Sequence, residues 1–449
     1  MSRRLHISVR IALLAALYCL GAFAQDNYLV KVAGDVQGIA KRHGLTVVRS
    51  LTGSASGYHV LSSRGVNPQT MLHNLSMDSA VNAAESEHAV QLPGIKPGSP
   101  VRPAGPTGGA VPLFSTLIWY YNSLAASAYV NQPATDVINM DRAHTLATGQ
   151  GIVATIDTGA DFSHSVLRGS LVPGWDFVHN SPGGQEQADV NQETTPILDQ
   201  ETTPILDQET TPILDGGTAI ILQQETTPIL DQETTPILDG KKYPAYGHGT
   251  MVAGLIHLVA PNAKIMPMRA FGADGSATIS QIVQAIAYAV DRGADVINMS
   301  FSVKQQSDAL AAAIVAAARR GVICVASAGN DDQANPQVWP AAYNNVIGVA
   351  ATDNSMIRAS FSNYGNTLVT LAAPGAGVIT TYPQGHYAQA WGTSFSAPLV
   401  SGAASLLLDR NSTTNETMAV ADLSNATPIR QELGAGELDL YRACRAAKN

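Results

Sequence analysis

Four short motifs place polar side chains where they could act together on an acyl group. Ser394 lies in the segment GTSFSAP, directly before an apolar run with helical spacing. Its hydroxyl would lie at a helix N-terminus, where free N–H groups favour negative charge. His248 lies in GHGT before another apolar run, and Asp157 and Asn330 each follow an apolar strand. A serine, a histidine, a carboxylate and an amide are the parts of a nucleophilic acyl-transfer site.

Each motif also has a simpler interpretation. A serine that follows glycine and threonine before a helix is commonly an N-cap, a lone histidine is commonly structural, and Asn330 in SAGN fits a turn. The triplet DTG at Asp157 also occurs in aspartic proteases, but a single-chain enzyme of that class needs two copies and this sequence has one. The acyl-transfer hypothesis therefore requires a fold that brings the four motifs together.

The elements that could position these motifs alternate between strand and helix from residue 114 onward. Apolar patterns predict strands at residues 151–156, 264–268, 296–300, 322–326 and 346–350, and helices at 251–259, 279–292 and 307–320. This alternation predicts an α/β fold with a mostly parallel, doubly wound sheet that is covered on both faces. Functional residues are then expected at the carboxyl ends of the strands, where Asp157 and Asn330 lie.

Together the four motifs resemble those of the subtilisin-like serine proteases, the subtilases, and they occur in that family's order. The resemblance covers roughly residues 115–449, including a closing segment GAGELD. It implies a subtilisin-like fold and a serine endopeptidase in which Ser394 is the nucleophile and His248 the general base. By the same resemblance, Asp157 fixes the histidine tautomer, and Asn330 binds the oxyanion together with the backbone N–H of Ser394.

The resemblance also implies a substrate-binding surface made of two tripeptides. The first matches the strand that pairs with substrate backbone and consists of Ser300, Phe301 and Ser302. The second matches a wall of the primary specificity pocket and consists of Ser327, Ala328 and Gly329. The chemistry requires no cofactor, and no metal ligand is assigned. Family members with a strong calcium site often have an Asp shortly after the catalytic Asp motif, where this chain has HSVL at 164–167. Any structural calcium ion therefore has no assignable ligands.

Three segments precede the predicted catalytic domain, residues 114–449. Residues 1–24 contain three arginines, an apolar run and AFA before Gln25, as in a secretory signal peptide. A retained anchor is the alternative, but the apolar run is short for a bilayer. Residues 25–92 are predicted to be a small α+β domain and resemble the family's inhibitory propeptide. Residues 93–113, rich in proline and glycine, are predicted to be an exposed, cleavable linker.

An acidic repeat interrupts the predicted catalytic domain between Asp157 and His248. The octapeptide QETTPILD occurs five times within residues 192–239, which contain five Glu and five Asp and no Lys or Arg. A proline in every copy excludes a continuous helix. We predict a solvated surface loop, with a stacked array that binds cations or basic partners as the alternative. Because the insertion lies between two residues of the predicted site, we expect it to modulate access of macromolecular substrates.

Charge and cysteine content restrict the remaining alternatives. The net charge of −9 comes from the repeats, so a nucleic-acid-binding surface has no support. After the predicted signal only Cys324 and Cys444 remain; a disulfide between them is one alternative, although the apolar context of Cys324 indicates a buried strand residue.

We predict a monomeric protease without a stable membrane anchor, secreted to the periplasm or the medium. It would be a self-processing zymogen that acts on proteins or peptides and has its own propeptide as intramolecular inhibitor. The alternative function is a catalytically idle secreted binding protein that displays the acidic repeat on a subtilase scaffold.

Overall fold

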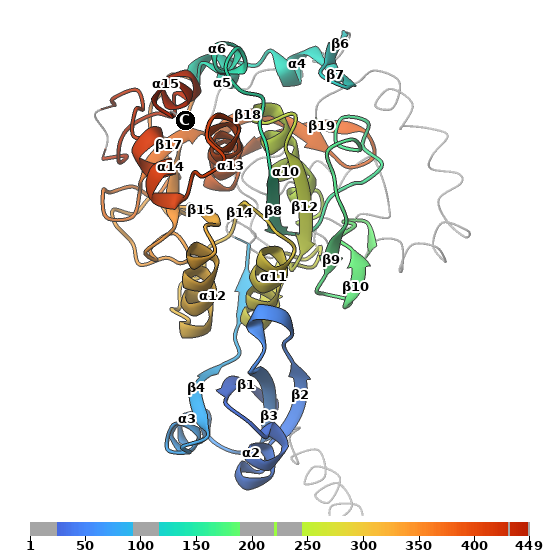
Figure 1. The fold of residues 1–449 in the computed structure, drawn as a ribbon, viewed down its shortest axis with the longest axis vertical. Helices are drawn as coiled ribbons and strands as arrows, with labels where there is room; N and C mark the ends of the chain where they lie inside the picture. Colours follow the sequence, from blue (N-terminus) through green and yellow to red (C-terminus); the bar gives the residue numbers. More distant parts are fainter. Residues whose placement is uncertain (1–24, 93–115, 189–219, 222–244, 430–431, 448–449) are drawn as a thin grey trace, which may run out of the picture. The chain divides into compact units, whose positions relative to one another are not determined.

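The computed structural model describes residues 25–92, 116–188, 220–221, 245–429 and 432–447 (Figure 1). The chain divides into two compact units, one that ends at His88 and one that begins at Ala89. The predicted signal peptide, most of the linker and all copies of the octapeptide lie outside the described residues. Within those ranges, no helix is both long enough and apolar enough to cross a bilayer.

The first unit is an antiparallel sheet of four strands with two helices, in the strand order β2-β3-β1-β4. Asp35 caps the first helix through the N–H of Gln37, and Gly44 ends it in the left-handed conformation. This is the α+β arrangement predicted for these residues. Its elements are β1 (Gln25–Val32), α2 (Val36–His43), β2 (Thr46–Ser50), η1 (Gly53–Ala55), β3 (Tyr58–Arg64), α3 (Pro68–Ser76) and β4 (Val81–Ser86).

The second unit is built on a sheet in the order β10-β9-β12-β8-β14-β15-β16-β17. Only β10 runs antiparallel to its neighbour, so the prediction of a mostly parallel α/β sheet is confirmed. The strands are β8 (Ile152–Asp157), β9 (Gly174–Asp176), β10 (Ser181–Gly183), β12 (Lys264–Arg269), β14 (Val296–Met299), β15 (Ile323–Ser327), β16 (Ile347–Thr352) and β17 (Leu371–Pro374).

Helices pack on both faces of this sheet, because successive strand residues point to opposite faces. Val153, Val296 and Ile323 belong to a core cluster with α10 (His248–Val259) and α13 (Thr393–Arg410). The other pair, α11 (Ile279–Asp291) and α12 (Asp308–Arg319), pack against each other and against the strands (Figure 1). These four helices supply the covering layers that the sequence predicted.

Shorter elements surround this sheet. The strand β5 (Ala89–Gln91) pairs antiparallel with β13 (Ser276–Thr278). Between the third and fourth octapeptides, β11 (Ile220–Ile221) lies parallel to one strand of the β18–β19 hairpin. The remaining elements are β6 (Leu117–Tyr120), β7 (Ser123–Ala126), β18 (Ala376–Tyr382), β19 (His386–Trp391), α4 (Ser127–Val130), α5 (Pro133–Val137), α6 (Met140–His144), α14 (Glu416–Leu423) and α15 (Leu440–Ala446).

The two cysteines of the described chain are free and buried, so the structure contains no disulfide between Cys324 and Cys444. Cys324 lies in the central strand β15 and Cys444 in the last helix, α15. Burial raises the pKa of each thiol to about 12. Both therefore behave as small apolar core residues.

Candidate active site

Asp157 and His248 meet at the carboxyl end of β8. Asp157 is the last residue of that strand, His248 is the first residue of α10, and both are buried. His248 Nδ1 lies 2.8 Å from Asp157 Oδ1. A carboxylate only accepts, so Nδ1 holds the proton and Nε2 of the neutral ring has the lone pair. The Thr158 N–H also donates to Asp157 Oδ1 at 2.7 Å, which fixes the carboxylate from a second side.

Glycines at the start of α10 allow this close approach. Gly247 has a φ of 93°, in the left-handed region. A Cβ on Gly249 would overlap the carbonyl oxygen of Gly159, so only glycine lets the helix pack against the turn after β8. The helix begins at His248, three residues before the predicted start at residue 251, because the low helix propensity of glycine conceals the first turn in the sequence.

Ser394 lies in the first turn of α13. The N-cap position belongs to Gly392, so the N-cap interpretation of Ser394 is wrong. Ser394 Oγ donates to the carbonyl of Ser300 at 3.2 Å, and Ser300 Oγ donates to the carbonyl of Ser394 at 2.8 Å. The ring centroid of Phe395 lies 5.4 Å from that of His248. The start of α13 is thus held beside the end of β14 and the ring of His248.

Asn330 is oriented by the residue that precedes Ser394. The backbone N–H and the Oγ1 of Thr393 both donate to Asn330 Oδ1 at 2.9 Å. Because the hydrogen-bond network fixes the carbonyl end of the amide, its NH2 end points away from Thr393. The N–H of Gly329 donates to Thr393 Oγ1 at 3.1 Å. The loop after β15 and the start of α13 are therefore joined through one threonine.

The two predicted substrate-binding tripeptides lie at the carboxyl ends of the neighbouring parallel strands β14 and β15. Ser327 Oγ donates to the carbonyl of Phe301 at 3.4 Å, which places the tripeptides side by side. Ser300 and Phe301 are fully buried, as is Ala328. In this structure the three residues are therefore covered by neighbouring parts of the chain.

Asn363 supports this region, although no sequence motif indicated it. Its Nδ2 donates to the carbonyl of Ala328 at 2.8 Å, and its Oδ1 accepts from the N–H groups of Asp331 and Gln333. A Cβ on Gly329, where φ is 92°, would lie 2.6 Å from the same amide nitrogen. Glu186, which accepts from the N–H of Gly247, is a second polar residue that no sequence motif indicated.

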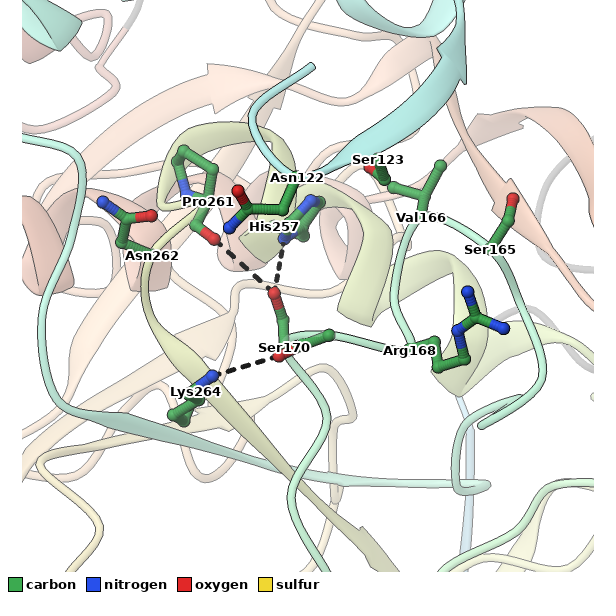
Figure 2. Close-up of a pocket in the computed structure, with 11 residues that line it drawn as sticks. Asn122, Ser123, Ser165, Val166, Arg168, Ser170, His257, Pro261, Asn262 and Lys264 are labelled. Carbon is green, nitrogen blue, oxygen red and sulfur yellow. Dashed lines mark hydrogen bonds between the residues drawn. The ribbon is translucent and has the colours of Figure 1, made fainter. Parts of the chain in front are cut away.

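A pocket of about 170 Å³ lies apart from these residues (Figure 2). Polar groups of this pocket bond within the chain: Ser170 Oγ lies 3.0 Å from His257 Nδ1, and Lys264 Nζ donates to the carbonyl of Gly169 at 3.0 Å. None of the predicted site residues lines it. In the described parts of the chain, no three His, Cys, Asp or Glu side chains form a group able to hold a metal ion.

Known proteins show which family has these motifs. The model of the subtilase family, peptidase family S8, matches residues 149–437 and so includes all four motifs. The chain belongs to the subtilase family. The thermophilic serine proteinase of Bacillus sp. (strain AK1) is 34% identical to this subtilase over 261 residues, which are 58% of this chain and 52% of that protein. Thermitase from Thermoactinomyces vulgaris is 30% identical over 296 residues, 64% of this chain and 85% of thermitase.

Solved structures agree with this assignment. A protease of Pseudoalteromonas arctica PAMC 21717 superposes with a TM-score of 0.55 and 26% identity, over 72% of this subtilase and 97% of that chain. Fervidolysin from Fervidobacterium pennivorans has a TM-score of 0.66 over 95% of this chain and 61% of its own, and its 21% identity supports the fold alone. The subtilase spans about half the length of the first curated relatives that it matches.

Proposed function

We propose that this subtilase is a secreted, monomeric serine endopeptidase that forms an acyl-enzyme through Asp157, His248 and Ser394. The proposal depends most on the bond between His248 Nδ1 and Asp157 Oδ1, which leaves Nε2 as the proton acceptor. Nε2 takes the proton of Ser394 as Oγ attacks the scissile carbonyl carbon. It then gives that proton to the leaving amine, and a water molecule repeats both steps to release the acid. No step uses a metal ion or a cofactor.

Asn330 is proposed to donate its amide N–H to the oxyanion, together with the backbone N–H of Ser394. We expect Asn330→Ala to lower kcat by about 10²–10³ with little change in KM, because the amide binds an oxygen that becomes charged only in the transition state. Peptide hydrolysis by titrated enzyme measures both constants. The control is Asn425→Ala, an exposed amide at the end of α14 that should leave kcat unchanged. A rise in KM with an unchanged kcat would instead assign Asn330 to ground-state binding.

A segment at the start of the second unit supports the zymogen proposal. The strand β12 ends beside Asp157, so residues 270–278 leave the sheet at the active-site edge. There β5 pairs antiparallel with β13, and the Leu92 N–H donates to the carbonyl of Gly275 at 2.9 Å. Peptides bind sheet edges by such backbone pairing. Residues 89–92 are therefore proposed to cover this edge, as a bound peptide would, until the chain after them is cut, and residues 25–92 to act as the inhibitor.

The insertion is proposed to limit access of large substrates. The Gly247 N–H donates to a carboxylate oxygen of Glu186 at 2.8 Å, so the chain departs and returns beside His248. Deleting residues 192–239 should raise kcat/KM for a folded protein and leave that for a short peptide unchanged. A full-length variant in which Gln and Asn replace the Glu and Asp of the repeats tests whether the charge or the size of the insertion limits access. Unchanged rates for both substrates after the deletion would mean that the insertion is a passive expansion.

A further inference from the structure

Glu186 is a buried carboxylate that the proposed chemistry does not use. It is 1% exposed and lies shortly before the octapeptide insertion. Its Oε1 accepts from the N–H of Gly247 at 2.8 Å, the N–H of Gly249 at 3.3 Å and the hydroxyl of Thr158. Its Oε2 accepts from the N–H of Thr250 at 3.1 Å and from the hydroxyl of the same threonine. One carboxylate therefore binds five donors.

Three of these donors are backbone N–H groups at the beginning of α10. A helix start leaves such groups without partners inside the helix and favours a negative charge. The N-cap residue, Gly247, has no side chain to accept them. Glu186 takes over that capping function from a distant part of the sequence. It therefore fixes the first turn of the helix, whose first residue is His248.

The same carboxylate also fixes the end of β8. Thr158 Oγ1 donates to Glu186 and accepts from the Gly249 N–H at 2.9 Å, while the Thr158 N–H donates to Asp157 Oδ1. Asp157 is part of β8, and His248 is part of α10. The distance between the two side chains therefore depends on how β8 and α10 are joined, and Glu186 binds both.

We propose that Glu186 is a positioning residue for the Asp157–His248 pair. We also propose that it holds together the two chain segments that flank the insertion. This inference rests on the proposed function of that pair. The bond from Gly247 to Glu186 joins the chain before the repeats to the chain after them. His248 is therefore held by contacts that do not include the repeats, and a change in the insertion need not move it.

Ionisation of Glu186 strengthens this function, because a carboxylate accepts from all five donors whereas a protonated carboxyl turns one oxygen into a donor. Burial, with a smaller contribution from the charge of Asp157, raises the pKa of Glu186 to about 7 against the opposing effect of the hydrogen bonds from Thr158 and Thr250. Tyr246, Tyr382 and His248 are the other titratable groups nearby. Activity should therefore rise with pH through this pKa.

Glu186→Gln tests the proposal, because the side chain keeps its size but presents an NH2 group to the donors at the start of α10. We expect kcat to fall by about 10² with KM nearly unchanged, since a small displacement of a reacting group has an effect of that size. Glu186→Asp should give an intermediate kcat. The matched control is Glu437→Gln, another buried glutamate, which accepts from Thr352 Oγ1 at 2.9 Å and contacts no site residue. Its kcat should equal that of the unchanged enzyme.

A second measurement does not require activity. In protein with Ser394→Ala, the low-field proton NMR signal of His248 Nδ1–H reports its bond to Asp157. Adding Glu186→Gln should shift or abolish this signal, whereas adding Glu437→Gln should preserve it. If Glu186→Gln does not fold, Thr158→Val replaces it, because valine removes the hydroxyl that joins Glu186 to the Gly249 N–H.

An unchanged kcat together with an unchanged NMR signal in folded Glu186→Gln protein would overturn the inference. A chain that hydrolyses no peptide even without substitutions would instead contradict the proposed function. In that case the NMR comparison alone decides whether Glu186 positions His248.

Discussion

Ser394→Ala is expected to lower kcat by about 10⁶, because no other group can form the acyl bond with the scissile carbonyl carbon. The substitution removes only the Oγ atom, which donates to the carbonyl of Ser300 among its contacts. Hydrolysis of a chromogenic peptide gives the rate. Mass spectrometry of the purified precursor gives the second result: the substituted chain stays uncut after residue 92, whereas the unchanged chain is processed.

A serine farther along the same helix provides the control. Ser405 Oγ donates to the carbonyl of Gln150 at 2.7 Å, far along α13 from Ser394. Ser405→Ala should lower the free energy of unfolding by about 1 kcal/mol and leave kcat unchanged. Identical, unprocessed masses for the unchanged and Ser394→Ala chains would favour the catalytically idle binding protein. N-terminal sequencing of the processed chain locates the boundary of the mature enzyme.

Asp157→Asn is expected to lower kcat by about 10⁴ with KM nearly unchanged. Two effects act together in this buried site. The amide has no charge to stabilise the imidazolium that forms when His248 takes the proton of Ser394. It can also present its NH2 group to Nδ1, which puts the histidine proton on Nε2, where the serine proton must go.

The comparison for this substitution is Asp308→Asn, a carboxylate in the first turn of α12. Its loss should weaken the favourable interaction with the helix dipole, worth roughly 0.3–1 kcal/mol of stability, and leave kcat unchanged. Circular dichroism of both variants checks that they are folded. A loss of less than tenfold in Asp157→Asn would mean that the Glu186 network, without the charge of Asp157, is sufficient to orient His248.

The parts of the site that sequence could predict are those encoded by local patterns. The apolar run before Asp157 predicted a strand that ends at this carboxylate, and β8 ends there. The contacts of Glu186 could not be predicted in this way, since its partner Gly247 lies 61 positions away across the insertion. Asn363 is similar: it binds the carbonyl of Ala328, 35 positions earlier, from a segment without periodicity. Such contacts are fixed by tertiary packing and leave no local pattern.

The end of the first unit shows the same limit for a strand. The predicted first domain covers residues 25–92, and the first compact unit ends at His88. Val90 and Leu92 are buried. The hydrophobic pattern of a strand predicts that one face is buried but does not predict which sheet edge the strand joins. Here the edge is β13 of the second unit.

The alkylation rates of the two buried thiols can report how the folded chain opens. Only a thiolate reacts with an alkylating reagent, so Cys324 and Cys444 are protected while their surroundings stay closed. Cys444 lies in the short helix α15, which can open locally, whereas Cys324 lies in the parallel sheet. Alkylation at Cys444 therefore measures local opening, and alkylation at Cys324 measures global unfolding. Because neither reaction depends on catalysis, both rates can be followed in a Ser394→Ala chain, which does not digest itself.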